Sequence, residues 1–212
     1  MCGFAALLDA GRTFDPLLLA GIEQDLLHRG PDSGGQRSWT GAALVFRRLA
    51  IIDTRAVSDQ PMDSADGRQT LVFNGEIYGY LTLREELESR GVRFRSRSDT
   101  EVLLHGYLTW GMDGLLERID GMYAFALFDA RDRTLFLVRD RLGQKPLYYS
   151  LDSNRLLFAS DIRSIWAVKD DLNLDFEALD YFLSELAMPQ PRTILTSSSR
   201  LLPSVSVNPT TS

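Results

Sequence analysis

The chain has 212 residues, 44% of them hydrophobic, and this length and composition suit one large domain with a substantial core better than two small ones. Its 29 acidic and 23 basic residues give a formal net charge of -6, which argues against the phosphate backbone of nucleic acids as a partner. One cysteine excludes an internal disulfide and makes a poor zinc site with two distant histidines, and no apolar run approaches the roughly 20 residues of a membrane span.

In the first half of the chain, expected strands alternate with expected helices. Asp15 followed by Pro16 provides an N-cap and a first helical residue, and Ser98 with Glu101 has the spacing of a capping box. Short apolar runs indicate strands, and the run that ends at Phe73 leads into Asn74-Gly75, a dipeptide typical of turns. We therefore expect strands at residues 2–8, 42–46 and 69–73, and helices from Asp15 to the Gly30-Pro31 break, at residues 80–90 and from Ser98 toward Gly111.

In the second half, the period of the apolar residues changes from that of helices to that of strands. Four apolar segments, separated by turn residues such as 129–133 and 152–154, are typical of an antiparallel meander. A last helix is expected from Asp175 to Leu186, before Pro189. Helices between early strands, followed by hairpins, predict an α+β layered domain rather than a doubly wound parallel sheet. The four segments are MYAFALFD (122–129), TLFLVRD (134–140), PLYYS (146–150) and RLLFAS (155–160).

We assign residues 1–202 to this one domain. From Thr196 onward the sequence is rich in Ser, Thr, Val and Pro with almost no charge, which predicts a mobile tail over residues 203–212. A glycine-rich phosphate-binding loop is not evident, because the segment 32–35 (Asp-Ser-Gly-Gly) has neither a strand before it nor a helix after it.

Cys2 directly follows the initiator methionine, and a small second residue favours removal of that methionine. Removal would place a thiol and a free α-amine on one residue. An α-amine titrates near roughly 7.7 to 8.0, so a good fraction is unprotonated at neutral pH and can accept the thiol proton. The alternative is that Cys2 is a small apolar residue that opens a buried strand.

Four further segments combine residues that suit a binding site with an ordinary structural explanation. For residues 28–32 (His-Arg-Gly-Pro-Asp), the structural explanation is a turn that ends a helix. For the arginine pair before the apolar run 49–53, it is solvated charges that open a strand. For residues 98–101, it is a helix cap. In Asn74-Gly75-Glu76, an amide and a backbone N–H can supply two oxyanion donors and Glu76 can receive a ligand ammonium; alternatively the segment is a turn with a solvated carboxylate.

Together, these five segments resemble the N-terminal glutaminase domain of class II glutamine amidotransferases, which are N-terminal-nucleophile hydrolases. The asparagine synthetase B branch is the most similar, since sister branches use other residues in place of Arg-Gly-Pro-Asp and Arg-Leu-Ala-Ile-Ile-Asp. The resemblance implies a four-layer αββα sandwich, in which two antiparallel sheets are flanked by helices. It spans roughly residues 2–202, including GMYAFALFD (121–129), RDRLGQKPLYY (139–149) and FASDIRSI (158–165).

The resemblance also implies a role for each site residue. Cys2 corresponds to the nucleophile that attacks the side-chain amide of glutamine and forms a glutamyl thioester. The side-chain amide of Asn74 and the backbone N–H of Gly75 correspond to the oxyanion hole. A zwitterionic amino acid needs a guanidinium at one end and carboxylates at the other. The residues implied to bind glutamine are Arg48, Leu49, Ala50, Ile51 and Ile52 at its α-carboxylate, Asn74 and Gly75 at its side chain, and Glu76 and Asp99 at its α-ammonium.

The chain departs from the family pattern at two positions near these residues. Phe46 stands where members usually have His or Glu shortly before the arginine that corresponds to Arg48, and Gly79 stands where Asn commonly follows Glu-Ile-Tyr. Neither change removes a residue assigned to glutamine, so we expect a slowed enzyme rather than an inactive one.

The synthetase domain that follows in asparagine synthetases, with its Ser-Gly-Gly-x-Asp loop, is not found in this sequence. ATP and Mg are expected only on that missing domain, and no cofactor or metal is expected here. We expect a cytoplasmic enzyme that neither binds nucleic acid nor enters a membrane, and that passes ammonia to a synthetase domain or subunit facing residues 122–128 and 147–149. The alternatives are a non-catalytic glutamine-binding regulatory module paired with a separate synthetase, and an amide hydrolase for another acyl substrate.

Overall fold

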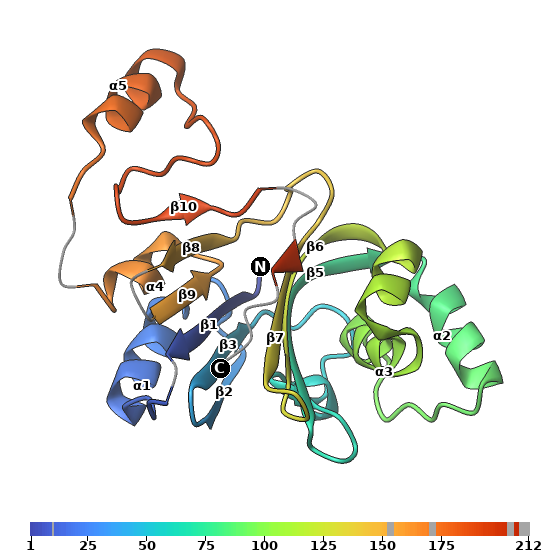
Figure 1. The fold of residues 1–212 in the computed structure, drawn as a ribbon. Helices are drawn as coiled ribbons and strands as arrows, with labels where there is room; N and C mark the ends of the chain where they lie inside the picture. Colours follow the sequence, from blue (N-terminus) through green and yellow to red (C-terminus); the bar gives the residue numbers. More distant parts are fainter. Residues whose placement is uncertain (10, 152–154, 170–172, 203–205, 208–212) are drawn as a thin grey trace.

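The computed structural model describes residues 1–9, 11–151, 155–169, 173–202 and 206–207. Two antiparallel sheets lie face to face, and helices cover the outer face of each sheet (Figure 1). The domain therefore has the four-layer αββα arrangement that the sequence predicts.

The first sheet has six strands in the order β10-β8-β9-β1-β3-β2. Its buried strand β1 (Gly3–Asp9) pairs antiparallel with β3 (Ala42–Arg48) on one side and with β9 (Arg155–Ala159) on the other. Because β1 begins at Gly3, these two pairings place Cys2 at one end of the sheet, next to the end of β3. The other strands are β2 (Ser33–Trp39), β8 (Tyr148–Leu151) and β10 (Ser199–Arg200).

The second sheet has five strands in the order β11-β7-β6-β5-β4. Strand β5 (Gln69–Tyr78) pairs over its whole length with β6 (Asp120–Asp129), so Asn74 lies opposite Ala124 and Gly75 lies opposite Tyr123. The predicted turn at Asn74-Gly75 is therefore wrong, because pairing with β6 continues through both residues. The other strands are β4 (Met62–Asp63), β7 (Thr134–Arg139) and β11 (Ser206–Val207).

The main core lies between the two sheets, where large apolar side chains of β1, β3 and β9 meet those of β5, β6 and β7. Strand β6 is covered on both faces, with Ala124 and Ala126 between the sheets and Phe125 and Leu127 beneath the helices. Leu147, in the loop before β8, is also fully buried. The prediction that residues 122–128 and 147–149 face a partner is wrong, because these segments supply the interior of the domain.

Helices α1 (Pro16–Asp25) and α4 (Ile162–Trp166) pack on the outer face of the first sheet. The Asp15 carboxylate accepts a hydrogen bond from the N–H of Leu17, which confirms the predicted N-cap. The predicted helix end at Gly30-Pro31 is too late, because α1 ends at Asp25 and hydrogen-bonded turns, not helix, continue from there to Gly30.

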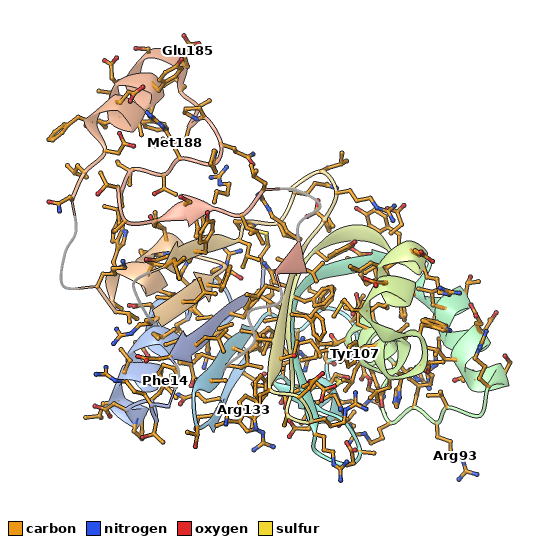
Figure 2. All side chains as sticks on the ribbon, viewed as in Figure 1. Phe14, Arg93, Tyr107, Arg133, Glu185 and Met188 are labelled. Atoms are coloured by element: carbon orange, nitrogen blue, oxygen red, sulfur yellow. The ribbon has the colours of Figure 1, made fainter. Side chains whose placement is uncertain are left out.

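Helices α2 (Tyr80–Ser89) and α3 (Asp99–Arg118) cover the second sheet. Ser98 caps α3 by accepting from the N–H of Glu101, but Glu101 accepts from the N–H groups of Arg95 and Ser96 instead of closing a reciprocal box. Gly111, with a φ of 71°, marks a kink within α3 rather than its end. Tyr107, labelled in Figure 2, donates its hydroxyl to the buried Asp129 and fastens α3 to β6.

Helix α5 (Phe176–Glu185) begins at its predicted Asp175 cap but lies apart from the four layers (Figure 1). Glu185, labelled in Figure 2, lies at the end of this segment farthest from the sheets, whereas Met188 lines a cavity with Tyr148 of β8. Within the part of the chain described, no helix is long and apolar enough to cross a membrane. The α5 segment carries a group of exposed apolar side chains: Phe176, Tyr181, Phe182, Leu183 and Leu186.

Three further predictions are corrected or limited. The four expected strands of the meander form as β6 to β9, but β6 and β7 belong to the second sheet whereas β8 and β9 belong to the first. The apolar run 49–53 is a loop, because β3 ends at Arg48. The predicted turn at 152–154 and most of the predicted tail lie outside the described residues; within that tail, Ser206–Val207 pair with β7.

Candidate active site

A cavity of about 190 Å³ opens where the start of β1, the end of β3, the middle of β5 and the start of α3 converge. Four of the five sequence segments contribute to its wall, although they are separated by up to roughly a hundred residues in the chain. The fifth segment, residues 28–32, lies behind the wall. The lining residues include Met1, Cys2, Arg48, Leu49, Ile51, Ile52, Gln60, Asn74, Gly75, Glu76, Asp99, Thr100 and Lys145. Ala50 is not among them.

Cys2, which directly precedes the first residue of β1, lines this cavity. Its Sγ atom lies 3.4 Å from the N–H of Leu49 and 3.6 Å from the carbonyl oxygen of the same residue. Burial raises the pKa of the Cys2 thiol above its ordinary value, and the N–H of Leu49 partly opposes this shift. A thiol held in this way needs a nearby base before it becomes a strong nucleophile.

Asn74 and Gly75 line the same cavity from the middle of β5. Asn74 is only 1% exposed, and its Nδ2 atom has no hydrogen-bond partner among the described residues. Burial of an amide N–H without an acceptor is unfavourable, so Nδ2 of Asn74 is a candidate donor to a bound ligand. At Gly75, a Cβ atom would lie 2.2 Å from the carbonyl oxygen of Met122, so only glycine fits against β6 at this point.

The loop after β3 curls around the guanidinium of Arg48. The Nη2 atom donates to the carbonyl oxygens of Ile52 (3.2 Å) and Asp53 (2.6 Å), and Nη1 donates to the carboxylate of Asp59 (2.6 Å). The guanidinium nitrogens of Arg48, which the resemblance implies bind a ligand carboxylate, are therefore already hydrogen-bonded within the loop. Within this loop, the N–H groups of Ile51 and Ile52 carry no hydrogen bond to the described residues and remain available as donors.

Hydrogen bonds of Asp53 connect this loop to the residues just before α3. Asp53, at a φ of 49°, accepts from the N–H of Arg97 and from the guanidinium of Arg55, and these bonds hold the pKa of the Asp53 carboxyl well below its usual range. Gln60 adds a link across the cavity floor, accepting from the N–H of Phe73 (2.6 Å) and donating to Thr100 (3.2 Å). Neither role was predicted, because both act through backbone groups that only the fold brings close.

Residues 28–32 hold the thiol and the loop from behind. The Nε atom of Arg29 donates to the carbonyl oxygen of Cys2 (3.1 Å), and the carboxylate of Asp32 accepts from the N–H of Ala50 (2.7 Å). Gly30 passes so close to β3 that a Cβ atom would lie 2.3 Å from the carbonyl carbon of Arg47. The helix-end interpretation of this segment was wrong, since α1 already ends at Asp25, whereas the turn forms and its polar groups also position Cys2 and Ala50.

Comparison with known proteins shows the family of this chain. A family model of the glutamine amidotransferase domain matches residues 1–211. The chain belongs to the glutamine amidotransferase domain family. It is 38% identical over 198 residues to asparagine synthetase [glutamine-hydrolyzing] 1 of Bacillus subtilis, which covers 92% of this chain and 31% of that protein. It is 32% identical over 222 residues to a putative asparagine synthetase [glutamine-hydrolyzing] 2 of Methanocaldococcus jannaschii, covering 95% of this chain and 42% of that protein.

The fold of this amidotransferase domain also matches solved structures. A glutamine phosphoribosylpyrophosphate amidotransferase from B. subtilis superposes with a TM-score of 0.66 at 21% identity, covering 79% of this chain and 43% of that chain. At this identity the likeness shows the fold alone. The chain spans less than half of the length of the curated relatives described above.

Glu76 and Asp99 place two carboxyl groups on the wall of the cavity. Glu76 is exposed on β5, whereas Asp99 is 4% exposed at the start of α3 and accepts from the N–H groups of Ile77 (3.2 Å) and Thr100 (2.9 Å). Burial raises the pKa of the Asp99 carboxyl to about 6. A cation bound beside Asp99 would reverse this cost, since an opposite charge favours the ionised carboxylate.

The two departures from the family pattern leave the backbone of the amidotransferase site in place. Phe46 is fully buried between the sheets, where it packs with Phe4 rather than lining the cavity. Gly79 has a φ of 63° and a ψ of 19°, a left-handed conformation in which glycine and asparagine are the two residues most readily accommodated. The substitution of glycine for asparagine at this position therefore keeps the turn into α2.

Proposed function

We propose that this domain hydrolyses the side-chain amide of glutamine and supplies ammonia to a synthetase of the asparagine-synthetase type in the cytoplasm. The observation that carries the proposal is the unpartnered Nδ2 of Asn74, buried in the same cavity as the Cys2 thiol. A thiol and an amide donor without a protein acceptor, both on the lining of one cavity, suit attack on a carbonyl carbon whose oxygen becomes negatively charged. Family membership and the glutamine-hydrolysing relatives support glutamine as the amide.

The proposed reaction begins when removal of Met1 frees the α-amine of Cys2. The amine takes the thiol proton, and Sγ forms a bond to the amide carbon of glutamine. The oxyanion accepts hydrogen bonds from Nδ2 of Asn74 and the N–H of Gly75. The carbon–nitrogen bond then breaks as the α-ammonium of Cys2 gives its proton to the departing nitrogen, which leaves as ammonia. Water then hydrolyses the thioester, releasing glutamate and the free thiol. No metal or cofactor is needed for these steps.

Glutamine is proposed to lie with its two charged ends on opposite walls. Glu76 and Asp99 receive the α-ammonium. The α-carboxylate is placed beside Arg48 and the N–H groups of Ile51 and Ile52, because the N–H groups of Leu49 and Ala50 already bond to Cys2 and Asp32. Arg48 would then act through its positive charge and its hold on the loop.

The direct test is the release of ammonia and glutamate from glutamine by protein that has lost Met1. The proposal predicts equal amounts of both products and no turnover of asparagine, whose shorter side chain cannot reach Cys2 while its charged ends are bound. Processed, folded protein that binds glutamine in a calorimeter but releases no ammonia would instead support the non-catalytic alternative and overturn the proposal.

The raised pKa of Asp99 predicts a pH-dependent affinity for glutamine. Below pH 6 the carboxyl of the empty domain is mainly protonated, and above pH 6 it is ionised and attracts the α-ammonium. We therefore expect KM for glutamine to fall about tenfold between pH 5 and pH 7. In Asp99→Asn, KM is expected to be higher at neutral pH and nearly independent of pH over this range. A wild-type KM that rises with pH would contradict the assignment of Asp99.

The same shift has a consequence for stability. Because the folded-state pKa lies above the unfolded value, the contribution of Asp99 to stability is fully present below pH 4 and is lost as the pH rises toward 6. Glutamine that binds the ionised form should restore stability above pH 6.

We further propose that α5 faces the synthetase-type domain that accounts for the remaining length of the relatives. Leu183 is 68% exposed, and it belongs to the exposed apolar group on a helix that no sheet covers. Exposed apolar groups of this kind mark surfaces that another protein surface covers. Since the segments first predicted to face a partner are buried, α5 takes that role.

Leu183→Asp should leave glutamine hydrolysis by the isolated domain unchanged. When the domain is mixed with the synthetase part of the B. subtilis relative, this variant should lower glutamine-dependent synthesis severalfold, with ammonia-dependent synthesis unaffected. Ser184→Asp adds the same charge at a neighbouring exposed position and is the control. Equal losses in both variants would show that the apolar side chain is not the contact.

A further inference from the structure

Lys145 lies on the cavity wall in a loop between β7 and β8 whose backbone is fixed from two sides. The carboxylate of the fully buried Asp140 accepts from the N–H of Lys145 (2.9 Å), and the Nε atom of Arg139 donates to its carbonyl oxygen (2.6 Å). Asp140 also accepts from the N–H groups of Leu142 and Gln144. These hydrogen bonds fix the backbone of Lys145, from which its side chain reaches the cavity wall.

Among the described residues, no carboxylate forms an ion pair with the ammonium of Lys145. The residue is 8% exposed, and no carboxylate of the described residues lies within 4.0 Å of Nζ. The contact that the structure does give to Nζ is the thioether sulfur of Met1, at 3.8 Å. Loss of Met1 would remove this contact and leave a buried positive charge on the cavity wall that also carries the new α-amine of Cys2.

We infer that Lys145 is a positioning residue whose fixed positive charge keeps the freed α-amine of Cys2 unprotonated at neutral pH, an inference that rests on the proposed function. Two like charges in one partly dry cavity disfavour each other, so the nearby ammonium opposes protonation of the amine. An amine that stays neutral is the form that can take the thiol proton.

The other charged groups around the amine do not replace Lys145. Arg48 is paired with Asp59, and Arg29, which bonds to the carbonyl oxygen of Cys2, lies 4.0 Å from Asp161. The carboxyl groups of Glu76 and Asp99 act in the opposite sense and favour the protonated amine. Once the α-ammonium of glutamine neutralises those two carboxylates, the charge of Lys145 remains uncompensated and acts on the amine.

The test compares Lys145→Met with Lys145→Arg. Methionine keeps much of the length and apolar stem without the charge, whereas arginine keeps the charge. For each protein, intact mass first verifies that Met1 is absent, and kcat at saturating glutamine, which reports the state with glutamine bound, is then measured from pH 5.5 to 9.5. In Lys145→Met the acid limb should move upward by about half to one pH unit, so activity at pH 6.5 falls roughly 3- to 10-fold. At pH 9 it should stay within about twofold of wild type, and Lys145→Arg should follow the wild-type profile.

A second measurement separates failure of this inference from failure of the proposed function. In a Cys2→Ser background, the pH dependence of α-amine acetylation by acetic anhydride, followed by mass spectrometry, reports the titration of the amine without any catalysis. Its midpoint should rise when Lys145→Met is added. Unchanged midpoints, coincident pH profiles, or an equal loss at every pH would overturn the inference, whereas a wild-type protein without glutaminase activity would overturn the proposed function.

Discussion

Replacing Cys2 by alanine is expected to reduce glutamine hydrolysis by at least about 10,000-fold, because no other thiol exists in the chain. The fold should persist. Among the described residues, the hydrogen bonds of the Sγ atom are two long ones with Leu49, its packing against the core is partial, and Cys2 precedes the paired residues of β1. Thermal unfolding within about 2 °C of wild type, together with ammonia release below detection, would match the account.

The matched variant is Cys2→Ser, which keeps a small residue after Met1 and so keeps the conditions for methionine removal. It should bind glutamine but turn it over far more slowly, because a hydroxyl is a weaker nucleophile than a thiolate. Ammonia release by Cys2→Ala at a rate near that of wild type would refute Cys2 as the nucleophile.

Asn74→Ala is expected to lower kcat by about 100- to 1,000-fold while KM for glutamine changes little. An oxyanion donor stabilises the transition state by roughly 2.7 to 4 kcal/mol and contributes little to ground-state binding. Because Nδ2 of Asn74 bonds to none of the described residues, its removal should not weaken the fold. A loss of kcat without a loss of thermal stability distinguishes an oxyanion donor from an amide that stabilises the fold.

The control for Asn74 is Gln60, a second buried amide in the same cavity. Its amide bonds to Phe73 and Thr100, so Gln60→Ala should lower the unfolding temperature as well as the activity. A large loss of stability in Asn74→Ala, or a loss confined to KM, would contradict the oxyanion role.

Local signals in the sequence were sufficient for the helices and for most strands. The caps at Asp15 and Ser98 form where their side chains predict them, and the last helix begins after Asp175 as predicted, because an N-cap depends only on residues two or three positions away. The partition of strands between two sheets was not predictable in the same way. Alternating apolar residues show that a strand is buried, but not which sheet it joins.

Two local signals were overruled by longer-range contacts. Asn74-Gly75 is a common turn dipeptide, yet pairing with β6 from Gln69 to Tyr78 holds it in a strand. The apolar run after Arg48 has strand composition, yet the guanidinium of Arg48 gathers its carbonyl oxygens into a loop. Strand β2 was missed because it begins with Ser33-Gly34-Gly35, a composition that favours loops.

In the site as well, some residues could be predicted from the sequence and others could not. The resemblance named Cys2, Arg48, Asn74, Glu76 and Asp99, and the fold brings all five to one cavity. Residues that act on backbone groups escaped, including Gln60 at Phe73 and Arg29 at Cys2, because such contacts have no signature in residue type or spacing. Lys145 escaped for a different reason, since a lone lysine in a loop is usually solvated and only its burial singles it out.

The most direct measurement is the intact mass of catalytically active protein before and after labelling with diazo-oxo-norleucine, a glutamine-like electrophile. The account predicts a starting mass without Met1, a single adduct on Cys2, and loss of ammonia release in proportion to labelling. Active protein that retains Met1 quantitatively, or that loses activity through an adduct on another residue, would contradict the proposal that one terminal residue supplies both nucleophile and base.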